Sequence, residues 1–177
     1  MTSRVKLEVN QTWDGRPLPE AAAVSVRLEL DPEGLSLSIS APLYGDPAPP
    51  SSPGPTWRLW EYEVVEVFVC GPGDRYTEIE VGPAGHFLVL RLEGRRQVVA
   101  QVDTLALEVT QHGGRWSATA RLACEHLPPG PHTLNAYAIS GVGAERRYSA
   151  AYPYQGDAPD FHALETFRPW AEVGEAP

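Results

Sequence analysis

Hydrophobic and polar side chains alternate along most of this sequence, and that pattern predicts β-strands rather than helices. The alternation is clear in residues 5–9, 24–30 and 35–40. Residues 31–34 (Asp-Pro-Glu-Gly) separate the second and third of these segments, with proline and glycine at positions that favour a tight turn. The first part of the chain is therefore expected to form a strand followed by a hairpin.

The same alternation continues through the centre and the C-terminal half of the chain, interrupted by glycine- and proline-containing turns. Further strands are expected at residues 64–70, 76–81, 86–92, 105–110, 116–123 and 133–140. One helical turn is expected at residues 124–127. About eight to ten short strands at this spacing predict an all-β fold, a two-sheet antiparallel β-sandwich or jelly roll.

The length of 177 residues is typical of one domain, and residues 1–177 are expected to form a single β-sandwich domain. Six prolines interrupt residues 41–56, so that stretch is expected to be neither strand nor helix. The strands on either side are too few to form separate sheets of their own. We therefore interpret residues 41–56 as a proline-rich surface loop within the domain.

Charge and hydropathy exclude several kinds of partner. The chain carries 14 basic and 23 acidic residues, and a formal net charge of −9 would repel the phosphates of a nucleic acid. No apolar run approaches the roughly 18 residues of a membrane span. The N-terminal residues begin an alternating strand and lack the apolar stretch of a signal peptide, so a cytoplasmic protein is expected.

Two neighbouring strands are expected to gather carboxylates on one face of a sheet. Glu66 and Phe68 point to one side of the strand at residues 64–70, and Glu78 and Glu80 share a side of the next strand. If the turn between the strands closes tightly, Glu66 lies opposite Glu80 and Phe68 lies opposite Glu78. Like charges placed directly opposite are destabilising, so these carboxylates are solvated, protonated, or bound to a counter-ion or ligand.

The next turn is expected to place Arg91 on the same face, beside Tyr76 and Glu78. A slip of one residue in the strand pairing would remove Arg91 from the group. The face then combines carboxylates, a guanidinium and aromatic rings, which suits a sugar because rings stack on its C–H faces and polar groups bind its hydroxyls. The alternative is an ordinary solvated outer face of an antiparallel sheet.

Four segments resemble the family 9 carbohydrate-binding modules, which belong to the wider DOMON-like group of β-sandwiches. These segments are residues 59–68 (Leu-Trp-Glu-Tyr-Glu-Val-Val-Glu-Val-Phe), 76–83, 134–137 and 159–162. The order and spacing match over roughly residues 57–167. An even closer resemblance is to an uncharacterised family of free-standing proteins with the same Leu-Trp-Glu-Tyr-Glu-Val-Val-Glu core.

The resemblance implies a ligand held between two tryptophans, with a glutamate, an arginine and an amide as polar contacts. It implies that Trp60 is the first stacking ring, Glu66 the acid, Asn135 the amide and Arg91 the arginine. The second tryptophan is missing from the strand of Asn135, where this chain has Tyr137. The full set of expected ligand-binding residues is Trp60, Glu66, Glu78, Glu80, Arg91, Asn135 and Tyr137.

Several of these residues also have structural interpretations. Trp60 is equally interpreted as a core anchor, and Asn135 as an amide satisfied within the fold. Phe161 and His162 are expected to lock the C-terminal segment by packing and hydrogen bonding, not to act in catalysis.

The favoured function is non-catalytic binding of a carbohydrate or sugar-like small molecule on a sheet face. One alternative is a protein-interaction or structural module without a sugar site, which would have an exposed apolar patch and no pocket near Trp60. A second is a small glycoside hydrolase that uses a carboxylate pair, but no hydrolase motif is recognised and no catalytic residue is assigned.

Cofactors and oligomeric state are less constrained by the sequence. The five histidines have no metal-ligand spacing, and the only methionine is Met1, which argues against methionine-ligated haem. No cofactor is assigned, the metal content is unknown, and calcium stays a candidate because clustered carboxylates and the family resemblance would suit it. The sequence leaves the oligomeric state undetermined.

Overall fold

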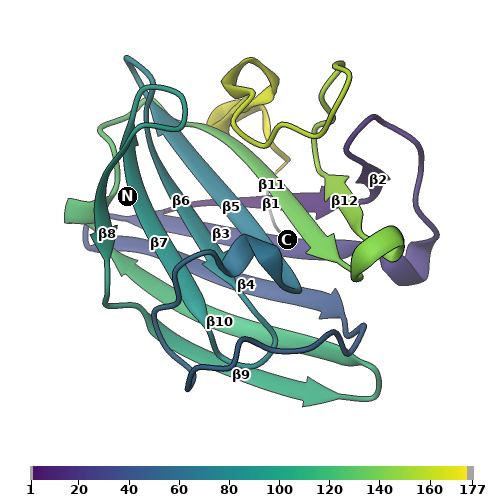
Figure 1. Ribbon diagram of the computed structural model, residues 1–177. Coiled ribbons are helices and arrows are strands. Elements are labelled where there is room, and N and C mark those ends of the chain that lie inside the picture. The colour runs from purple at the N-terminus through teal and green to yellow at the C-terminus, as the bar shows by residue number, and fades with distance from the viewer. Residues whose placement is uncertain (1, 175–177) are drawn as a thin grey trace.

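Two antiparallel β-sheets packed face to face form the fold in the computed structural model (Figure 1). The structure describes residues 2–174, so Met1 and residues 175–177 of the expected domain lie outside the described residues. The five-stranded sheet has the order β1 (Ser3–Val9), β3 (Val24–Asp31), β4 (Gly34–Pro42), β10 (Arg115–Ala123) and β9 (Ala106–His112). The all-β, two-sheet antiparallel sandwich that the alternation predicts is confirmed.

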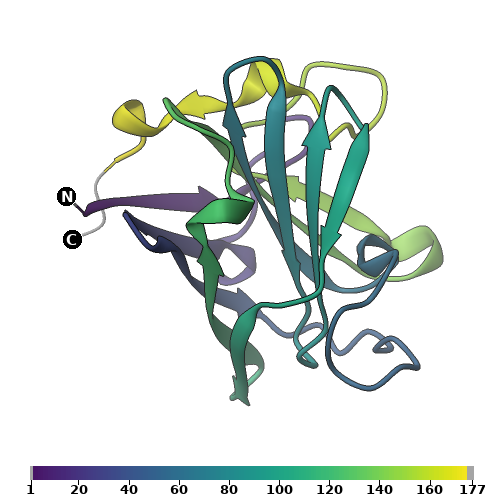
Figure 2. The same ribbon diagram turned by 90° about the vertical axis from the view of Figure 1, so that its left-hand side faces the viewer.

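The eight-stranded sheet carries the residues of interest. Along its main path the order is β2 (Gln11–Thr12), β12 (Arg147–Ala150), β11 (Thr133–Ser140), β5 (Val64–Gly71), β6 (Arg75–Val81), β7 (Phe87–Glu93) and β8 (Val98–Val102). The short β13 (Arg168–Pro169) pairs with β11 beside this path. Figure 2 turns the molecule by 90° and shows the strands β5 to β8 upright beside the other sheet. The jelly-roll and DOMON-like assignments stay predictions.

The long alternating segments of the sequence all form strands close to their expected bounds, and the turn at Cys124–His126 forms the 3₁₀ helix η3. The strands that the sequence analysis missed are β2, β8, β12 and β13. They are short, and β8 (Val-Val-Ala-Gln-Val) does not alternate cleanly. Their pairing with neighbours, not a local pattern, makes them strands.

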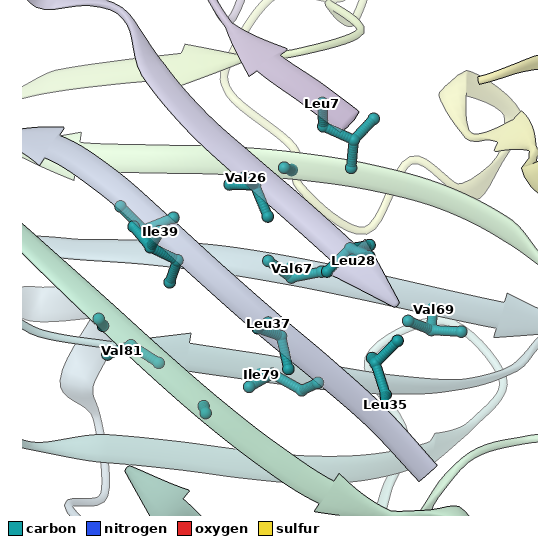
Figure 3. Packing of buried hydrophobic residues seen from close by; sticks show 14 of the residues in the cluster. Leu7, Val26, Leu28, Leu35, Leu37, Ile39, Val67, Val69, Ile79 and Val81 are labelled. Carbon is teal, nitrogen blue, oxygen red and sulfur yellow. The ribbon is translucent and has the colours of Figure 1, made fainter. Parts of the chain in front are cut away.

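The main hydrophobic core lies between the two sheets (Figure 3). Every second residue of β5, namely Val65, Val67 and Val69, points into it. Leu35, Leu37 and Ile39 of β4 meet them from the five-stranded sheet, together with alternate residues of β1, β3 and β10. Burial of this apolar surface, at roughly 25 cal/mol per Å², is the main force that holds the sheets together.

A second hydrophobic cluster covers the opposite face of the eight-stranded sheet. It contains Phe68, Tyr76 and Tyr137 from the strands and Leu59 and Phe167 from the segments that cross them. The 3₁₀ helices η2 (Leu59–Glu61) and η5 (Leu164–Thr166) belong to these covering segments. The outer face of this sheet is therefore largely shielded from water, not a solvated surface.

The remaining helices, η1 (Glu20–Ala22), η4 (Gly143–Glu145) and η6 (Trp170–Glu172), are also single 3₁₀ turns. Within residues 2–174, no helix has the length and apolar character needed to span a membrane.

Substitution of a residue at the centre of the core tests this packing. Leu37 is 1% exposed between the sheets, so Leu37→Ala is expected to lower the free energy of unfolding by about 2–5 kcal/mol through the lost burial and the cavity left behind. Ser38 follows it on the exposed side of β4, and Ser38→Ala is expected to change that free energy by less than about 0.5 kcal/mol. Urea unfolding of both variants measures the difference, and equal effects would contradict this core assignment.

Candidate functional site

Three glutamates meet on the outer face of the eight-stranded sheet. Glu66 of β5 pairs directly with Glu80 of β6, and Phe68 pairs with Glu78, so both predicted pairings are confirmed. One carboxylate oxygen of each glutamate lies within 4.8 Å of the others. The alternation that sends the valines of β5 and β6 into the core therefore also brings the three carboxyls together.

These carboxyls are buried and poorly satisfied. Glu66 is 2% exposed, Glu78 3% and Glu80 0%. Among the described residues, Glu66 Oε1 and both carboxylate oxygens of Glu80 have no hydrogen-bond partner. Burial raises the pKa of Glu78 to about 7, and burial together with the neighbouring glutamates raises the pKa of Glu66 and Glu80 well above the ordinary value. At least part of the cluster is therefore protonated at neutral pH.

The prediction that Arg91 lies beside Tyr76 and Glu78 is wrong. Val81 pairs with Phe87, so Arg91 pairs with Thr77 and projects from the opposite face of the sheet. The reason is that His86 belongs to the turn, where its backbone carbonyl accepts a hydrogen bond from Gly82 at 2.9 Å. This shifts the pairing by one residue from the expected register, and a shift of one residue exchanges the two faces of a strand.

A cavity of about 400 Å³ opens above the cluster. Glu66 and Glu78 form its acidic floor, and Leu90, Leu92 and Ile139 add apolar surface. Its other lining residues come from segments that cross the sheet and from neighbouring strands: Trp57, Trp60, Arg96, Val98, Tyr148, Pro159, Phe161 and His162. The site thus combines buried carboxyls with a rim of aromatic rings.

The first wall carries Trp57 and Trp60. Arg58 between them has a positive φ of 63°, which turns the chain sharply into the short helix η2. The next residue, Leu59, is 0% exposed in the outer hydrophobic cluster and anchors this turn against the sheet. The indole rings contact each other edge to face, with ring centroids 5.3 Å apart, and Trp57 is 54% exposed. The wall therefore presents aromatic surface to an incoming molecule.

Two further contacts fix this wall in place. The Thr56 N–H donates to the carbonyl of Phe87 at 2.8 Å, which ties the end of the proline-rich segment to β7. The Arg146 guanidinium donates to the carbonyl of Trp60 at 2.5 Å.

The second wall is the segment around Phe161 and His162. The Phe161 ring stacks on Tyr137 at 4.0 Å with an interplanar angle of 10°. His162 Nδ1 lies 2.7 Å from the hydroxyl of Tyr76. Asp160 accepts hydrogen bonds from the His162 N–H at 2.9 Å and from Arg96 at 2.7 Å. The expected packing and hydrogen-bonding roles of Phe161 and His162 are confirmed, and both side chains also line the cavity.

His162 is held in its neutral form. The Tyr76 hydroxyl accepts a hydrogen bond from the Arg96 N–H at 2.9 Å, and its own proton has His162 Nδ1 as an acceptor. The imidazole proton then resides on Nε2, which lies 4.0 Å from Glu78 Oε2. Burial and the nearby Arg96 lower the pKa of His162 to about 4, so the ring is uncharged at neutral pH.

Three of the expected ligand-binding residues lie beneath the cavity and do not line it: Glu80, Asn135 and Tyr137. The Asn135 amide donates to the Tyr137 hydroxyl and to the Tyr152 carbonyl, at 2.8 and 2.9 Å. Its carbonyl oxygen accepts from the backbone N–H groups of Ala136 and Tyr152. The interpretation of Asn135 as a structural amide therefore holds, and its further hydrogen bond to the Thr166 hydroxyl at 3.1 Å ties β11 to η5.

Several lining residues carried no site assignment in the sequence analysis. Trp57 could have been found, since it stands three positions before Trp60. Arg96 could not, because it lies in the turn between β7 and β8, where no pattern marks it, and reaches the site through a positive φ of 61°. Tyr148 lies on β12, a strand that the alternation did not reveal.

The glutamate cluster is also the one group of histidine, cysteine and acidic side chains within residues 2–174 that is close enough to hold a metal ion. Calcium takes about six to eight oxygen ligands, of which three carboxyls supply only part. Calcium binding stays a prediction.

Solved structures with a similar fold include sugar-binding proteins. A putative carbohydrate-binding protein from Bacteroides uniformis superposes with a TM-score of 0.69 at 18% identity, over 95% of this chain and 84% of that one. A family 9 carbohydrate-binding module from Caldicellulosiruptor kristjanssonii, in complex with cellotriose, gives a TM-score of 0.53 at 12% identity, over 99% of this chain and 80% of that one. At such identities the likeness concerns the fold alone.

Sequence relatives are much closer. No protein-family model matches the chain. The human UPF0462 protein C4orf33 is 39% identical over 170 residues, which cover 91% of this chain and 85% of the human protein. The mouse homologue is 38% identical over 173 residues, covering 93% of this chain and 90% of the mouse protein. The homologue from Danio rerio is 36% identical over 90% of this chain and 85% of its own length. This chain therefore belongs to the UPF0462 family.

Proposed function

We propose that this protein binds a carbohydrate or sugar-like small molecule, without catalysis, in the cavity above Glu66 and Glu78. The single observation that carries the proposal is an aromatic rim over an acidic floor in a cavity of about 400 Å³. That volume suits a small ligand, and sites of this kind combine apolar walls with a few fixed polar groups. The sugar-binding names of the structural neighbours support the proposal.

The cavity offers surfaces for both the apolar and the polar groups of a sugar. A pyranose ring offers apolar C–H faces that stack on aromatic rings, and Trp57, Trp60 and Tyr148 supply such rings. Its hydroxyls need both donors and acceptors, which carboxyl groups and the His162 imidazole can provide. Trp57 replaces, in this proposal, the second tryptophan that the strand of Asn135 lacks.

The interaction-module alternative is less well supported, because it required that no pocket lie beside Trp60. The hydrolase alternative keeps one argument, since two carboxyls line the cavity and hydrolysis needs two, about 5–10 Å apart. Chromatography of oligosaccharides incubated with the protein distinguishes the cases, because a binding protein returns them uncleaved.

Removal of a rim ring should weaken sugar binding. Trp60→Ala is expected to reduce the affinity by about 1–3 kcal/mol, by analogy with the stacking of bases on aromatic rings. Glu66→Gln is expected to reduce the affinity as well, because an NH₂ donor then replaces one of the two carboxyl oxygens that can accept from a sugar hydroxyl. Calorimetry and tryptophan fluorescence with a panel of mono- and oligosaccharides measure both effects.

Arg91→Gln is the matched control, because Arg91 lies on the same sheet but projects from its opposite face. Its sugar affinity should equal that of the unmodified protein. Absence of any saturable sugar binding at millimolar concentration, in a protein that is folded, would refute the proposed function.

The carboxyl cluster should make the fold less stable as the pH rises. Glu78 has a folded-state pKa of about 7, above the ordinary 4.5, so the folded protein keeps a proton that the unfolded chain has lost. Its contribution to stability is therefore complete below about pH 4.5 and is lost as the pH rises through 7. Most of the Glu78 loss falls between pH 4.5 and 7, and Glu66 and Glu80, whose pKa values also lie well above the ordinary value, extend the loss to higher pH. We therefore expect the free energy of unfolding still to fall between about pH 6.5 and 8.5, by an amount on the order of 1 kcal/mol or more.

Urea unfolding at the two pH values measures this change. The pKa of His162 is 6.5 in the unfolded chain and about 4 in the folded protein, so its own effect on stability lies below this pH range. Glu80→Gln removes one buried acid and should flatten the dependence, whereas Glu93→Gln, at an exposed position of β7, should leave it intact. A Glu80→Gln protein with an unchanged pH dependence would show that the cluster is not its source.

A further inference from the structure

We propose that the ligand is an amino sugar, whose protonated amine binds Glu66 and Glu78 at the floor of the cavity while its ring lies against the aromatic walls. This inference rests on the proposed function and specifies the ligand class of the same site. It follows from three features of the described residues: unpartnered buried acceptors, arginines that are engaged elsewhere, and a rim of aromatic faces.

The floor offers acceptors without donors. Glu66 lines the cavity and is 2% exposed, yet its Oε1 has no hydrogen-bond partner among residues 2–174. No lysine or arginine of the described chain lies within ion-pair distance of the three glutamates. Their nearest basic neighbour is the neutral His162, at 4.0 Å from Glu78. Buried carboxyls in such a position gain most from a ligand that brings both N–H donors and a positive charge.

The two arginines near the cavity have partners of their own. Arg96 forms an ion pair with Asp160 at 2.7 Å, and its side chain is 58% exposed. Arg146 donates to the carbonyls of Trp60 and Gly141. Both guanidinium groups act on the floor carboxyls from a distance, but neither forms an ion pair with Glu66 or Glu78. An anionic ligand such as a sugar phosphate would instead have to approach three carboxyl groups, which disfavours it.

The rim suits a cation for a second reason. The faces of tryptophan and tyrosine rings attract ammonium groups through their quadrupole, most strongly where water is excluded. Trp57, Trp60 and Tyr148 line the cavity, together with Phe161. The same rings stack on the C–H faces of a pyranose, so one wall can serve both the amine and the ring that carries it. The combination favours an amino sugar over a neutral sugar or a simple amine.

Binding of the amine should release protons. The groups that face the two floor carboxyls are Glu80 and Tyr76 on β6, Tyr137 on β11, Arg146 before β12, Arg96 after β7, and His162. Burial keeps part of the floor protonated at neutral pH. An ammonium group favours the ionised carboxylates, so at about pH 7 protons pass from the floor to the buffer as the ligand binds.

The test is calorimetric titration of the whole protein with matched pairs of sugars at pH 7. The pairs are glucosamine with glucose, galactosamine with galactose, and mannosamine with mannose. We expect at least one amino sugar to bind about tenfold or more tightly than its neutral partner, because charge-assisted hydrogen bonds are the stronger kind. Repeating that titration in buffers of different ionisation enthalpy should reveal proton release. Cyclohexylamine, which has the ring and the charge without the hydroxyls, should bind more weakly than the amino sugar.

Variants separate the amine contact from general binding. In Glu66→Gln and Glu78→Gln the ratio of amino-sugar to neutral-sugar affinity should fall towards one. In Trp60→Ala both affinities should fall, and the amino sugar should still bind more tightly than its neutral partner because the two carboxyls are intact. Because this ratio and the proton release can also be measured in the unmodified protein, the test does not depend on any variant folding.

The outcomes distinguish this inference from the proposed function. Equal affinities for all three pairs would overturn the inference and leave the sugar site standing. Binding of cyclohexylamine as tight as that of the amino sugars would overturn the sugar component of both. Binding of no probe by the folded protein would overturn both outright.

Discussion

The strict alternation of side chains along β5 and β6 is the constraint on which the rest of the molecule depends. One side of these central strands carries valines and an isoleucine that join the two sheets. The other side must then carry Glu66, Glu78 and Glu80 together, because neighbouring strands align their faces. The same alternation that builds the core on one face of the sheet therefore places three carboxyls on the other face.

The segments that cross the outer face of this sheet bury the three carboxyls and form the cavity. Without them the carboxyls would lie in water and keep their ordinary pKa values. The turn of Leu59 and the stacking of Phe161 on Tyr137 place two walls over the sheet, and the resulting burial raises the pKa of Glu78 to about 7. Protonation lowers the free-energy cost of burying these carboxyls, and a ligand that donates hydrogen bonds to them would lower it further.

Membership of the UPF0462 family and the likeness to carbohydrate-binding modules bear on different questions. The family is defined by sequence over nearly the whole chain, and its names state no activity. The structural neighbours share the fold at 12–18% identity, which does not transfer a binding site. The case for a ligand therefore rests on the residues of this cavity, above all on the aromatic rim over Glu66 and Glu78.

The sequence by itself determined the strands with clear alternation, the sandwich, and the meeting of Glu66, Glu78 and Glu80, because all of these follow from side-chain period and one tight turn. It could not determine the register after the second turn, where a single residue, His86, moved Arg91 to the other face. Nor could it place Arg96 or Tyr148, which reach the cavity through long-range strand pairing and a turn with positive φ. Local patterns record which side a residue faces, whereas only tertiary packing decides what covers that side.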